Sequence, residues 1–550
     1  MTRVNPSSVQ KFAFAHPRTW ALGSALVLAL TALSISVQGQ TFTDLHDFNC
    51  NVDGCNPQYG IVAQGRDGNL YSSLPAGGTN SLGTVYKSTP SGILGAIYPF
   101  SAGDGAGPSS GLTLGKDGNF YGATTGGGAN NYGTLFKITP TGTPTVLHDF
   151  TAAEGGGAFA APVADKTGKT FYGVTYYGRA YSITASKSFK LLPNPIPGSS
   201  RAPLILASDG NFYGTTQTGG TGYGTVFRLS PSGVVKVIYT FDGTHGYYPY
   251  APVIQGSDGF LYGTTYEGGS IANAAGVVFK LSTTGKITVL HQFDSTSTTD
   301  GYGPFGGLVE GPDGNLYGTT SIGAGNGTLT AGEIFKISKT GTGYTILHGF
   351  DSTHGGSPET TPILSTNGII YGETYAGGSG SGGVFYSLDA GFSPFVSMVG
   401  FPAGTPGQTI QILGQGFNTA TGVLFGTGSA TFSVISDTYM TASIPVEGTQ
   451  GYIAVTTGSG TLTSNKTFTV IPIIDSFTPT SGPVGSKVTI AGGGFHGATK
   501  VSFGGVKATT FSIDSGAQII ATVPTGAVTG TIQVTTPGGT ATSKEMFTVN

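Results

Sequence analysis

Short runs of alternating apolar and polar residues, separated by glycine-rich turns, fill the chain from residue 41 to residue 390. This alternation predicts β-strands, and an Asp-Gly pair between two apolar runs is typical of a tight hairpin. No stretch of useful length in this region shows an apolar period of 3.6. The strands of one unit read GLTL (111–114), FYGATT (120–125), GTLFKI (133–138) and TVLHDF (145–150). The pattern therefore predicts an all-β region built from four-stranded units.

One phrase marks each unit. Its core is Asp-Gly-Asn-Φ-Tyr-Gly, where Φ is Leu, Phe or Ile, and seven exact or altered copies occur between residues 67 and 372. Their tyrosines lie 41 to 55 residues apart, which is the period of a four-stranded propeller blade. These tyrosines are Tyr71, Tyr121, Tyr172, Tyr213, Tyr262, Tyr317 and Tyr371.

The two ends of the array are out of phase. The phrase of a fourth strand, DLHDF (44–48), comes before the first complete unit, and the last unit stops after its third strand, GGVFYSL (382–388). Open strand edges attract unwanted pairing, so a propeller closes its ring. We therefore expect residues 41–48 to pair with 382–388 and complete the seventh blade of a seven-bladed β-propeller over residues 40–390.

A second repeat, with a period of 78 to 79 residues, follows the propeller region. GQGF ends at Phe417 and GGGF at Phe495, while FTV occurs at 468–470 and again at 547–549. About 80 residues with many short alternating strands is typical of a β-sandwich. The sequence predicts two sandwiches, 392–470 and 471–550. Their predicted cores contain Phe417 with Phe425, and Phe495 with Phe503.

Residues 1–39 have the layout of a secretory signal peptide. Basic residues precede an apolar stretch at 21–37, and small residues at 37–39 provide a cleavage site. A transmembrane anchor is the alternative, but the stretch is short and diluted by small and hydroxyl residues. The expected mature chain is secreted or held at the cell surface, with no membrane-spanning segment.

Composition narrows the choice of partners. Charged residues make up 9% of the chain and the formal net charge is −3, so neither nucleic acid nor an anionic membrane surface is an expected partner. In an oxidising compartment, Cys50 and Cys55 are expected to form a local disulfide. Metal ligation or a redox pair is the alternative, although the spacing is not Cys-x-x-Cys.

Two family resemblances rest on these motifs. The phrases DGNFYGATTGGGANNYGTLFKI (117–138) and DGNFYGTTQTGGTGYGTVFRL (209–229) resemble the GloVer tandem repeat of exported bacterial proteins. The third copy departs from that repeat, with Lys-Thr-Gly-Lys at 166–169. The stretch SFTPTSGPVGSKVTIAGGGFHGATKVSFGG (476–505) resembles an IPT/TIG domain, which has an immunoglobulin-like fold. The resemblances imply export and a repeat scaffold, and neither implies one particular reaction.

The repeated polar residues do not indicate a catalytic or metal site. His46, His148, His291 and His348 occupy one register of successive blades, which favours packing over metal binding. The aspartates that open the repeated phrase fit turn positions, and they lack the further oxygen ligands of a calcium loop. The chain also lacks GxSxG in a strand–turn–helix context and HExxH. We expect no cofactor, no metal and no recognisable catalytic residue.

Two long loops between blades offer the best candidate binding surface, because variable loops on a rigid scaffold are where binding usually occurs. They combine aromatic rings with hydrogen-bond acceptors, a mixture suited to sugars. The candidate residues are Asp242, Tyr247, Tyr248, Tyr250, Asp294, Asp300, Tyr302 and Phe305. The alternative is that these rings only pack their own loops.

Two functions remain open at this stage. The first is an exported, non-catalytic binding or adhesion protein that recognises a polysaccharide or a cell-surface protein, with the sandwiches as spacers. The second is an extracellular carbohydrate-active enzyme, a glycosidase or lyase, which requires two carboxylates to converge in one pocket.

Overall fold

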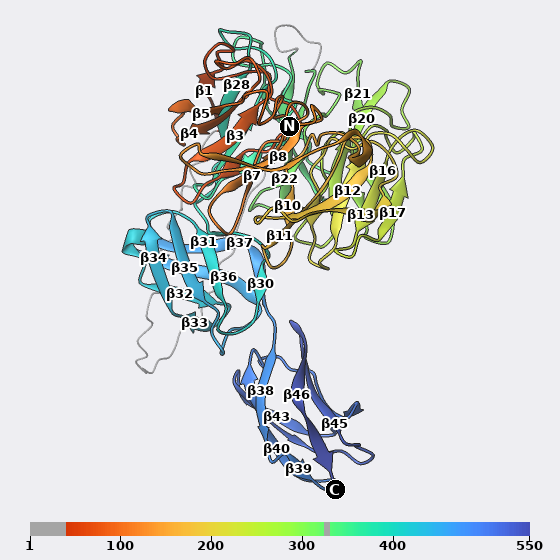
Figure 1. Cartoon of the computed structure of the whole chain (residues 1–550), viewed down its shortest axis with the longest axis vertical. Helices are drawn as coiled ribbons and strands as arrows, with labels where there is room; N and C mark the ends of the chain where they lie inside the picture. Colours follow the sequence, from red (N-terminus) through yellow and green to blue (C-terminus); the bar gives the residue numbers. More distant parts are fainter. Residues whose placement is uncertain (1–39, 324–330) are drawn as a thin grey trace, which may run out of the picture. The chain divides into compact units, whose positions relative to one another are not determined.

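The computed structural model describes residues 40–323 and 331–550 (Figure 1). The predicted signal peptide, residues 1–39, lies outside the described residues. The chain is all-β: a seven-bladed β-propeller is followed by two immunoglobulin-like β-sandwiches, as predicted. No helix within the described ranges is long and apolar enough to cross a membrane.

Each blade is a four-stranded antiparallel sheet whose strands follow one another from the inside outward. Blades one to three contain β2 (Ala63–Gln64), β3 (Leu70–Leu74), β4 (Thr84–Ser88), β5 (Leu94–Pro99), β6 (Thr113–Leu114), β7 (Phe120–Ala123), β8 (Thr134–Ile138), β9 (Pro144–Asp149), β10 (Val163–Ala164), β11 (Thr170–Val174), β12 (Arg179–Thr184) and β13 (Phe189–Pro195). A short 3₁₀ turn, η1 (Ala152–Glu154), lies between blades two and three.

Blades four to six repeat this order. They contain β14 (Ile205–Leu206), β15 (Phe212–Thr216), β16 (Thr225–Leu229), β17 (Val235–Thr240), β18 (Ile254–Gln255), β19 (Leu261–Thr265), β20 (Ala274–Leu281), β21 (Ile287–Asp294), β22 (Val309–Glu310), β23 (Asn315–Thr320), β24 (Glu333–Ser338) and β25 (Thr345–Gly349). The second strand of a blade is buried on both of its faces, because neighbouring blades cover them; all five residues of β15 are buried.

The seventh blade joins the two ends of the propeller. Its sheet runs β26 (Ile363–Leu364), β27 (Ile369–Glu373), β28 (Val384–Asp389) and β1 (Thr41–Asp47). β1 pairs antiparallel with β28, from Thr41 opposite Asp389 to Asp47 opposite Val384. The predicted closure of the ring is therefore confirmed. Directly after β1, Cys50 and Cys55 are joined by a disulfide, with their Cα atoms 4.8 Å apart.

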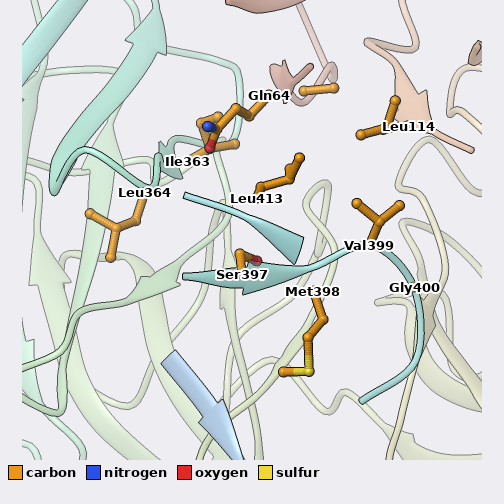
Figure 2. Close-up of a pocket in the computed structure, with 10 residues that line it drawn as sticks. Gln64, Leu114, Ile363, Leu364, Ser397, Met398, Val399, Gly400 and Leu413 are labelled. Atoms are coloured by element: carbon orange, nitrogen blue, oxygen red, sulfur yellow. The ribbon is translucent and has the colours of Figure 1, made fainter. Parts of the chain in front are cut away.

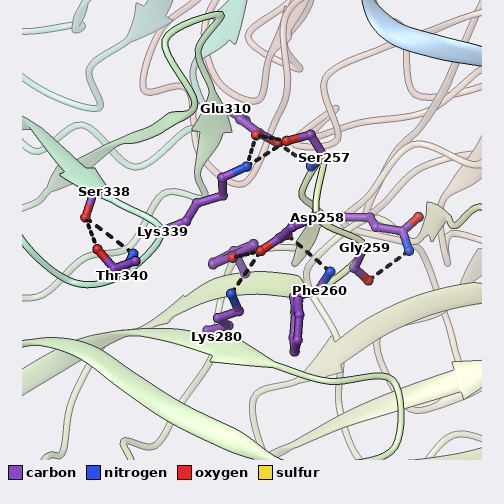
Figure 3. Close-up of polar contacts among 11 residues, drawn as sticks. Ser257, Asp258, Gly259, Phe260, Lys280, Glu310, Ser338, Lys339 and Thr340 are labelled. Atoms are coloured by element: carbon purple, nitrogen blue, oxygen red, sulfur yellow. Dashed lines mark hydrogen bonds and ion pairs between the residues drawn. The ribbon is translucent and has the colours of Figure 1, made fainter. Parts of the chain in front are cut away.

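The repeated phrase has a structural explanation. In five blades the tyrosine hydroxyl donates a hydrogen bond of 2.7 to 3.0 Å to the aspartate four residues earlier, as Tyr71 does to Asp67. The aspartate also holds its own turn, and lysines reinforce some copies. In blade five, Lys280 Nζ lies 2.9 Å from Asp258 Oδ2 and 4.0 Å from the centre of the Phe260 ring (Figure 3). The turn aspartates therefore brace their own blades.

Neighbouring blades are also joined through polar groups on the face of the propeller that carries the Asp-Gly turns. Glu310, at the end of β22, accepts hydrogen bonds from the Ser257 amide at 2.8 Å and the Ser257 hydroxyl at 2.6 Å, and it pairs with Lys339 (Figure 3). In blade three, the altered third copy lacks the aspartate, and Tyr172 donates instead to the Pro231 carbonyl at 3.2 Å.

The seam between blades seven and one holds a buried carboxyl group. Glu373, on β27, is 0% exposed, and it accepts hydrogen bonds from Tyr86 at 2.9 Å and Ser72 at 3.4 Å. Thr319 of blade six occupies the same register, and it donates to a loop carbonyl of the next blade. Burial raises the pKa of Glu373 to about 7, because the charged form loses its hydration.

The two sandwiches have the same strand order. In the first, the sheets are β29 (Ser397–Met398), β31 (Thr409–Leu413), β35 (Tyr439–Ser443) and β34 (Phe432–Ser436), against β30 (Ala403–Gly404), β37 (Gly460–Val470), β36 (Gly451–Thr457), β32 (Gly422–Phe425) and β33 (Gly428–Ala430). In the second they are β38 (Ile473–Thr478), β40 (Lys487–Gly493), β44 (Gln518–Thr522) and β43 (Phe511–Ser515), against β39 (Ser481–Gly482), β46 (Gly539–Val549), β45 (Gly530–Thr536), β41 (Lys500–Phe503) and β42 (Val506–Lys507). A 3₁₀ turn, η2 (Phe417–Thr419), precedes β32.

Each sandwich has its own aromatic core. Phe425 packs edge-on against Phe468 in the first, with ring centres 5.0 Å apart, and Phe503 packs against Phe547 in the second at 5.3 Å. All four of these side chains are 0% exposed. That each sandwich folds independently stays a prediction.

We predict that Glu373→Gln changes how stability depends on pH. The pKa of Glu373 is raised in the folded state, so protonated Glu373 contributes its full stabilisation to the fold below about pH 4.5. As the pH rises to about 7 this contribution is lost, and the free energy of unfolding falls by up to about 3 kcal/mol. Glutamine stays neutral, so the variant should gain free energy of unfolding relative to wild type between pH 4.5 and 7.5. Urea unfolding of the full chain at both pH values measures this. Exposed Glu545→Gln is the control, and equal pH dependence in all three proteins would contradict the prediction.

We also predict that a fragment of residues 471–550 folds alone. Phe503→Ala should lower its free energy of unfolding by about 3 to 5 kcal/mol, because removal of the buried ring leaves a cavity. Denaturant unfolding followed by circular dichroism measures both effects. Val528→Ala, at a side chain that is 57% exposed, should be nearly neutral. An unfolded wild-type fragment, or a silent Phe503→Ala, would show that this sandwich is not an independent unit.

Candidate functional site

One position of the repeat is aromatic in four blades and serine, arginine or glutamate in the other three. It lies four residues before the first residue of each innermost strand. The next residue is always small (Gly, Ser, Ala or Thr), whereas this one is aromatic, basic, acidic or polar. We call this set the axial ring: Tyr59, Ser109, Phe159, Arg201, Tyr250, Phe305 and Glu359.

The fold brings the axial ring together. The innermost strands of the propeller line its axis, and their starting ends all belong to the face that carries the long loops. Tyr59 of blade one shows the convergence, because its ring centre is 5.5 Å from that of Phe159 in blade three and 5.2 Å from that of Phe305 in blade six. Tyr59 therefore lies near the axis, between residues of distant blades.

Further rings extend this cluster across the loop face. Successive ring centres lie 4.7 to 6.3 Å apart, and contacts run without interruption from blade four through the axis to blade three. We call this set the aromatic track: Tyr223, Tyr247, Tyr248, Tyr250, Phe305, Tyr59, Phe159, Tyr176 and Tyr177. Its two end residues are the most exposed, Tyr223 at 41% and Tyr177 at 72%.

Two tyrosines of the track have strained backbones. Tyr59 has a φ of 62° and Tyr248 a φ of 57°. A bulky side chain is unfavourable in this left-handed region, and such strain is concentrated at binding and catalytic sites. In both cases the unusual backbone accompanies a ring that contacts other members of the track.

Arg201 and Glu359 supply opposite charges to the axial ring. The Arg201 guanidinium donates a hydrogen bond to the Tyr59 hydroxyl, and its central carbon lies 4.9 Å from the ring centres of both Tyr59 and Phe159. Glu359 accepts a hydrogen bond from Gln58 Nε2 at 2.5 Å. Burial raises the pKa of Glu359, and it raises that of Tyr59 to about 12 despite the nearby Arg201 charge.

Four of the eight residues predicted from the sequence lie on the track. These are Tyr247, Tyr248, Tyr250 and Phe305, and Tyr250 stacks on Phe305 with ring centres 4.7 Å apart. The prediction missed the remaining track members. Tyr59 and Phe159 stand alone in loops before innermost strands, and only an alignment of these loops on the strands reveals them. Tyr176, Tyr177 and Tyr223 lie in loops between the second and third strands of blades three and four, outside the two predicted loops.

The other four predicted residues hold their own loops. Asp242 pairs with His245 at 2.8 Å and Asp300 with His291 at 3.1 Å, while Asp294 accepts a hydrogen bond from the Thr296 amide at 2.9 Å. The Tyr302 amide bonds to the Ile322 carbonyl at 2.8 Å, and its ring packs against the core between blades five and six. Their hydrogen bonds and packing stabilise the loops that carry the track.

The repeated histidines pack as expected. His148 stacks on Phe189 with ring centres 3.6 Å apart, His348 stacks on Phe42 at 3.6 Å, and His46 bonds to Asp53 at 2.9 Å. Within residues 40–323 and 331–550, no group of three or more His, Cys, Asp or Glu side chains is arranged to hold a metal ion.

A cavity of about 270 Å³ lies on the other side of the innermost strands (Figure 2). The side chains of Leu114, Val399 and Leu413 surround it, and Gln64 is a polar group at its edge. Gln64 is already engaged, because its Nε2 donates to the Thr366 hydroxyl at 2.7 Å and its Oε1 accepts from the Thr366 amide at 3.0 Å. With no charged or aromatic side chain among the described residues that line it, this cavity offers less recognition chemistry than the loop face.

Comparisons with known proteins agree with the repeat architecture. A family model described as the Gloeobacter/Verrucomicrobia repeat matches residues 31–186 and 181–386, and the IPT/TIG domain model matches residues 472–549. A search of curated proteins finds no match.

Solved structures resemble the chain at low identity. Virginiamycin B lyase from Staphylococcus aureus is 14% identical, with 64% of this chain and 98% of that chain covered and a TM-score of 0.42. The periplasmic gluconolactonase of Pseudomonas aeruginosa is 16% identical, with 54% of this chain and 85% of that chain covered and a TM-score of 0.39. The surface glycan-binding protein PbSGBP-B from Prevotella bryantii is 19% identical, with 28% of this chain and 39% of that chain covered and a TM-score of 0.20.

Proposed function

Since this chain belongs to the Gloeobacter/Verrucomicrobia repeat family, we propose that its repeats form a scaffold for binding and that the aromatic track binds a polysaccharide. The protein acts outside the cell, secreted or at the cell surface, after removal of residues 1–39. The sandwiches serve as spacers. The continuous line of rings from Tyr223 to Tyr177 is the observation that carries this proposal.

The track has the chemistry that sugars need. Aromatic faces pack against the apolar C–H faces of sugar rings, and a few well-placed polar groups orient a ligand in an otherwise apolar site. Gln58, Arg201, Gln217 and Glu359 provide donors and acceptors beside the rings. Because the rings at the two ends of the track are exposed, a polysaccharide chain can extend beyond the track across the loop face in both directions.

The enzyme alternative makes a different demand. A glycosidase needs two carboxyl groups about 5 to 10 Å apart. The axial ring contributes one carboxyl group, Glu359, and its raised pKa suits an acid. A test for new reducing ends during incubation with a bound polysaccharide separates the two functions. Binding alone predicts unchanged chain length, and a loss of cleavage in Glu359→Gln would favour the enzyme.

We predict that Tyr177→Ala and Tyr223→Ala each weaken retention in polysaccharide-containing gels, and that the double variant weakens it further. Each lost stacking contact should cost about 1 kcal/mol, or roughly fivefold in affinity. Both side chains are exposed, so the free energy of unfolding of each variant should stay within about 0.5 kcal/mol of the wild-type value.

Tyr452→Ala is the matched control, because Tyr452 is 51% exposed but lies on the first sandwich. It should bind like wild type. If the Tyr177 and Tyr223 variants retain full binding while folded, the track is loop packing rather than a binding surface.

A further inference from the structure

Arg201 is a cation in a largely aromatic setting. Besides the contacts with Tyr59 and Phe159, its guanidinium lies 5.2 Å from the centre of the Tyr176 ring. Its hydrogen bonds go to the uncharged hydroxyls of Tyr59 and Tyr176. No carboxylate in the part of the chain that the structure describes forms an ion pair with it. A partly buried guanidinium is normally paired with an anion.

Two buried polar atoms beside this charge lack partners among the residues that the structure describes. Arg201 Nε has no hydrogen-bond acceptor there and Gln217 Oε1 has no donor, although Gln217 Nε2 donates to the Tyr176 hydroxyl at 3.3 Å. Buried polar atoms are nearly always hydrogen-bonded. Arg66 Nε and Arg179 Nε also lack partners among these residues. The feature that needs an explanation is therefore an unpartnered donor, Arg201 Nε, and an unpartnered acceptor, Gln217 Oε1, whose side chains bond to the same Tyr176 hydroxyl. A bound group that accepts from Arg201 and donates to Gln217 would satisfy both.

We propose that the polysaccharide is an acidic one, and that Arg201 binds the carboxylate of a uronic acid residue at the centre of the aromatic track. This inference rests on the proposed function. A carboxylate matches the planar fork of a guanidinium, and charge-assisted hydrogen bonds are roughly twice as strong as neutral ones. A hydroxyl of the same sugar supplies the donor for Gln217 Oε1. The surrounding rings exclude water and strengthen the ion pair.

The test compares two polymers with the same sugar backbone, whose carboxyl groups are either free or methyl-esterified. Polygalacturonate carries free carboxylates, and its methyl ester carries none. Wild type should bind polygalacturonate at least about tenfold more tightly than the ester at low salt, and the difference should shrink as salt is added. Arg201→Gln should reduce the ratio of the two affinities to about one, and Arg201→Lys should keep part of it.

Arg228→Gln is the control for net charge, because Arg228 lies on β16, away from the track. It should keep the wild-type ratio. Equal binding of both polymers by wild type, or an unchanged ratio in folded Arg201→Gln, would overturn the inference and leave the proposed function intact. Binding of neither polymer, nor of any neutral polysaccharide, would instead overturn the proposed function.

If Arg201→Gln does not fold, the wild-type ratio and its salt dependence still decide the question. A separate arm uses dextran sulfate and dextran. Preference for dextran sulfate without preference for polygalacturonate would assign the charge to sulfate recognition and contradict the carboxylate proposal.

Discussion

The pairing of β1 with β28 is the constraint on which the rest of the propeller depends. It joins residues more than 300 positions apart, from Thr41 opposite Asp389 to Asp47 opposite Val384. Closure removes the two exposed strand edges that an open array would leave. It also fixes the angular position of every blade, so that the loops before seven innermost strands meet at one axis. Tyr59 contacts Phe159 and Phe305 because of this closure.

The repeat separates stability from recognition. The residues that recur brace each blade, as the Asp67–Tyr71 hydrogen bond does, and similar bonds occur in four further blades. The residue that changes from blade to blade is the one delivered to the axis. A repeat protein can thus alter its binding chemistry one blade at a time without disturbing the bonds that hold the blades. The arginine at position 201 occupies a place where other blades have an aromatic, a serine or a glutamate.

The fold could be predicted largely from the sequence, because its signals are periodic. The phase shift between DLHDF and the last unit indicated the closure, and the spacing of 78 to 79 residues indicated two sandwiches with the same strand order. The aromatic-rich loops also indicated four of the nine residues of the aromatic track, including the stacked pair Tyr250 and Phe305.

The rest of the site could not be predicted in this way. Tyr59, Phe159 and Arg201 each stand alone in their loops, and the innermost strands that define their shared position are only two residues long. Such strands leave almost no pattern in the sequence. The sequence predicted the aspartates as hydrogen-bond acceptors for a sugar, but Asp242 and Asp300 are paired with histidines of their own blades. Sequence composition does not show whether an acceptor already has a partner.

Hydrogen–deuterium exchange of the full chain, with and without the polysaccharide that binds most strongly, tests the central claim most directly. We predict slower amide exchange in the loops at 56–61, 156–161, 198–203, 246–251 and 302–307, which carry Arg201 and six of the nine track residues. The Asp-Gly turns, such as 65–69, and both sandwiches should exchange as before. Protection confined to the turns or the sandwiches, with the five loops unchanged, would contradict a binding site at the propeller axis.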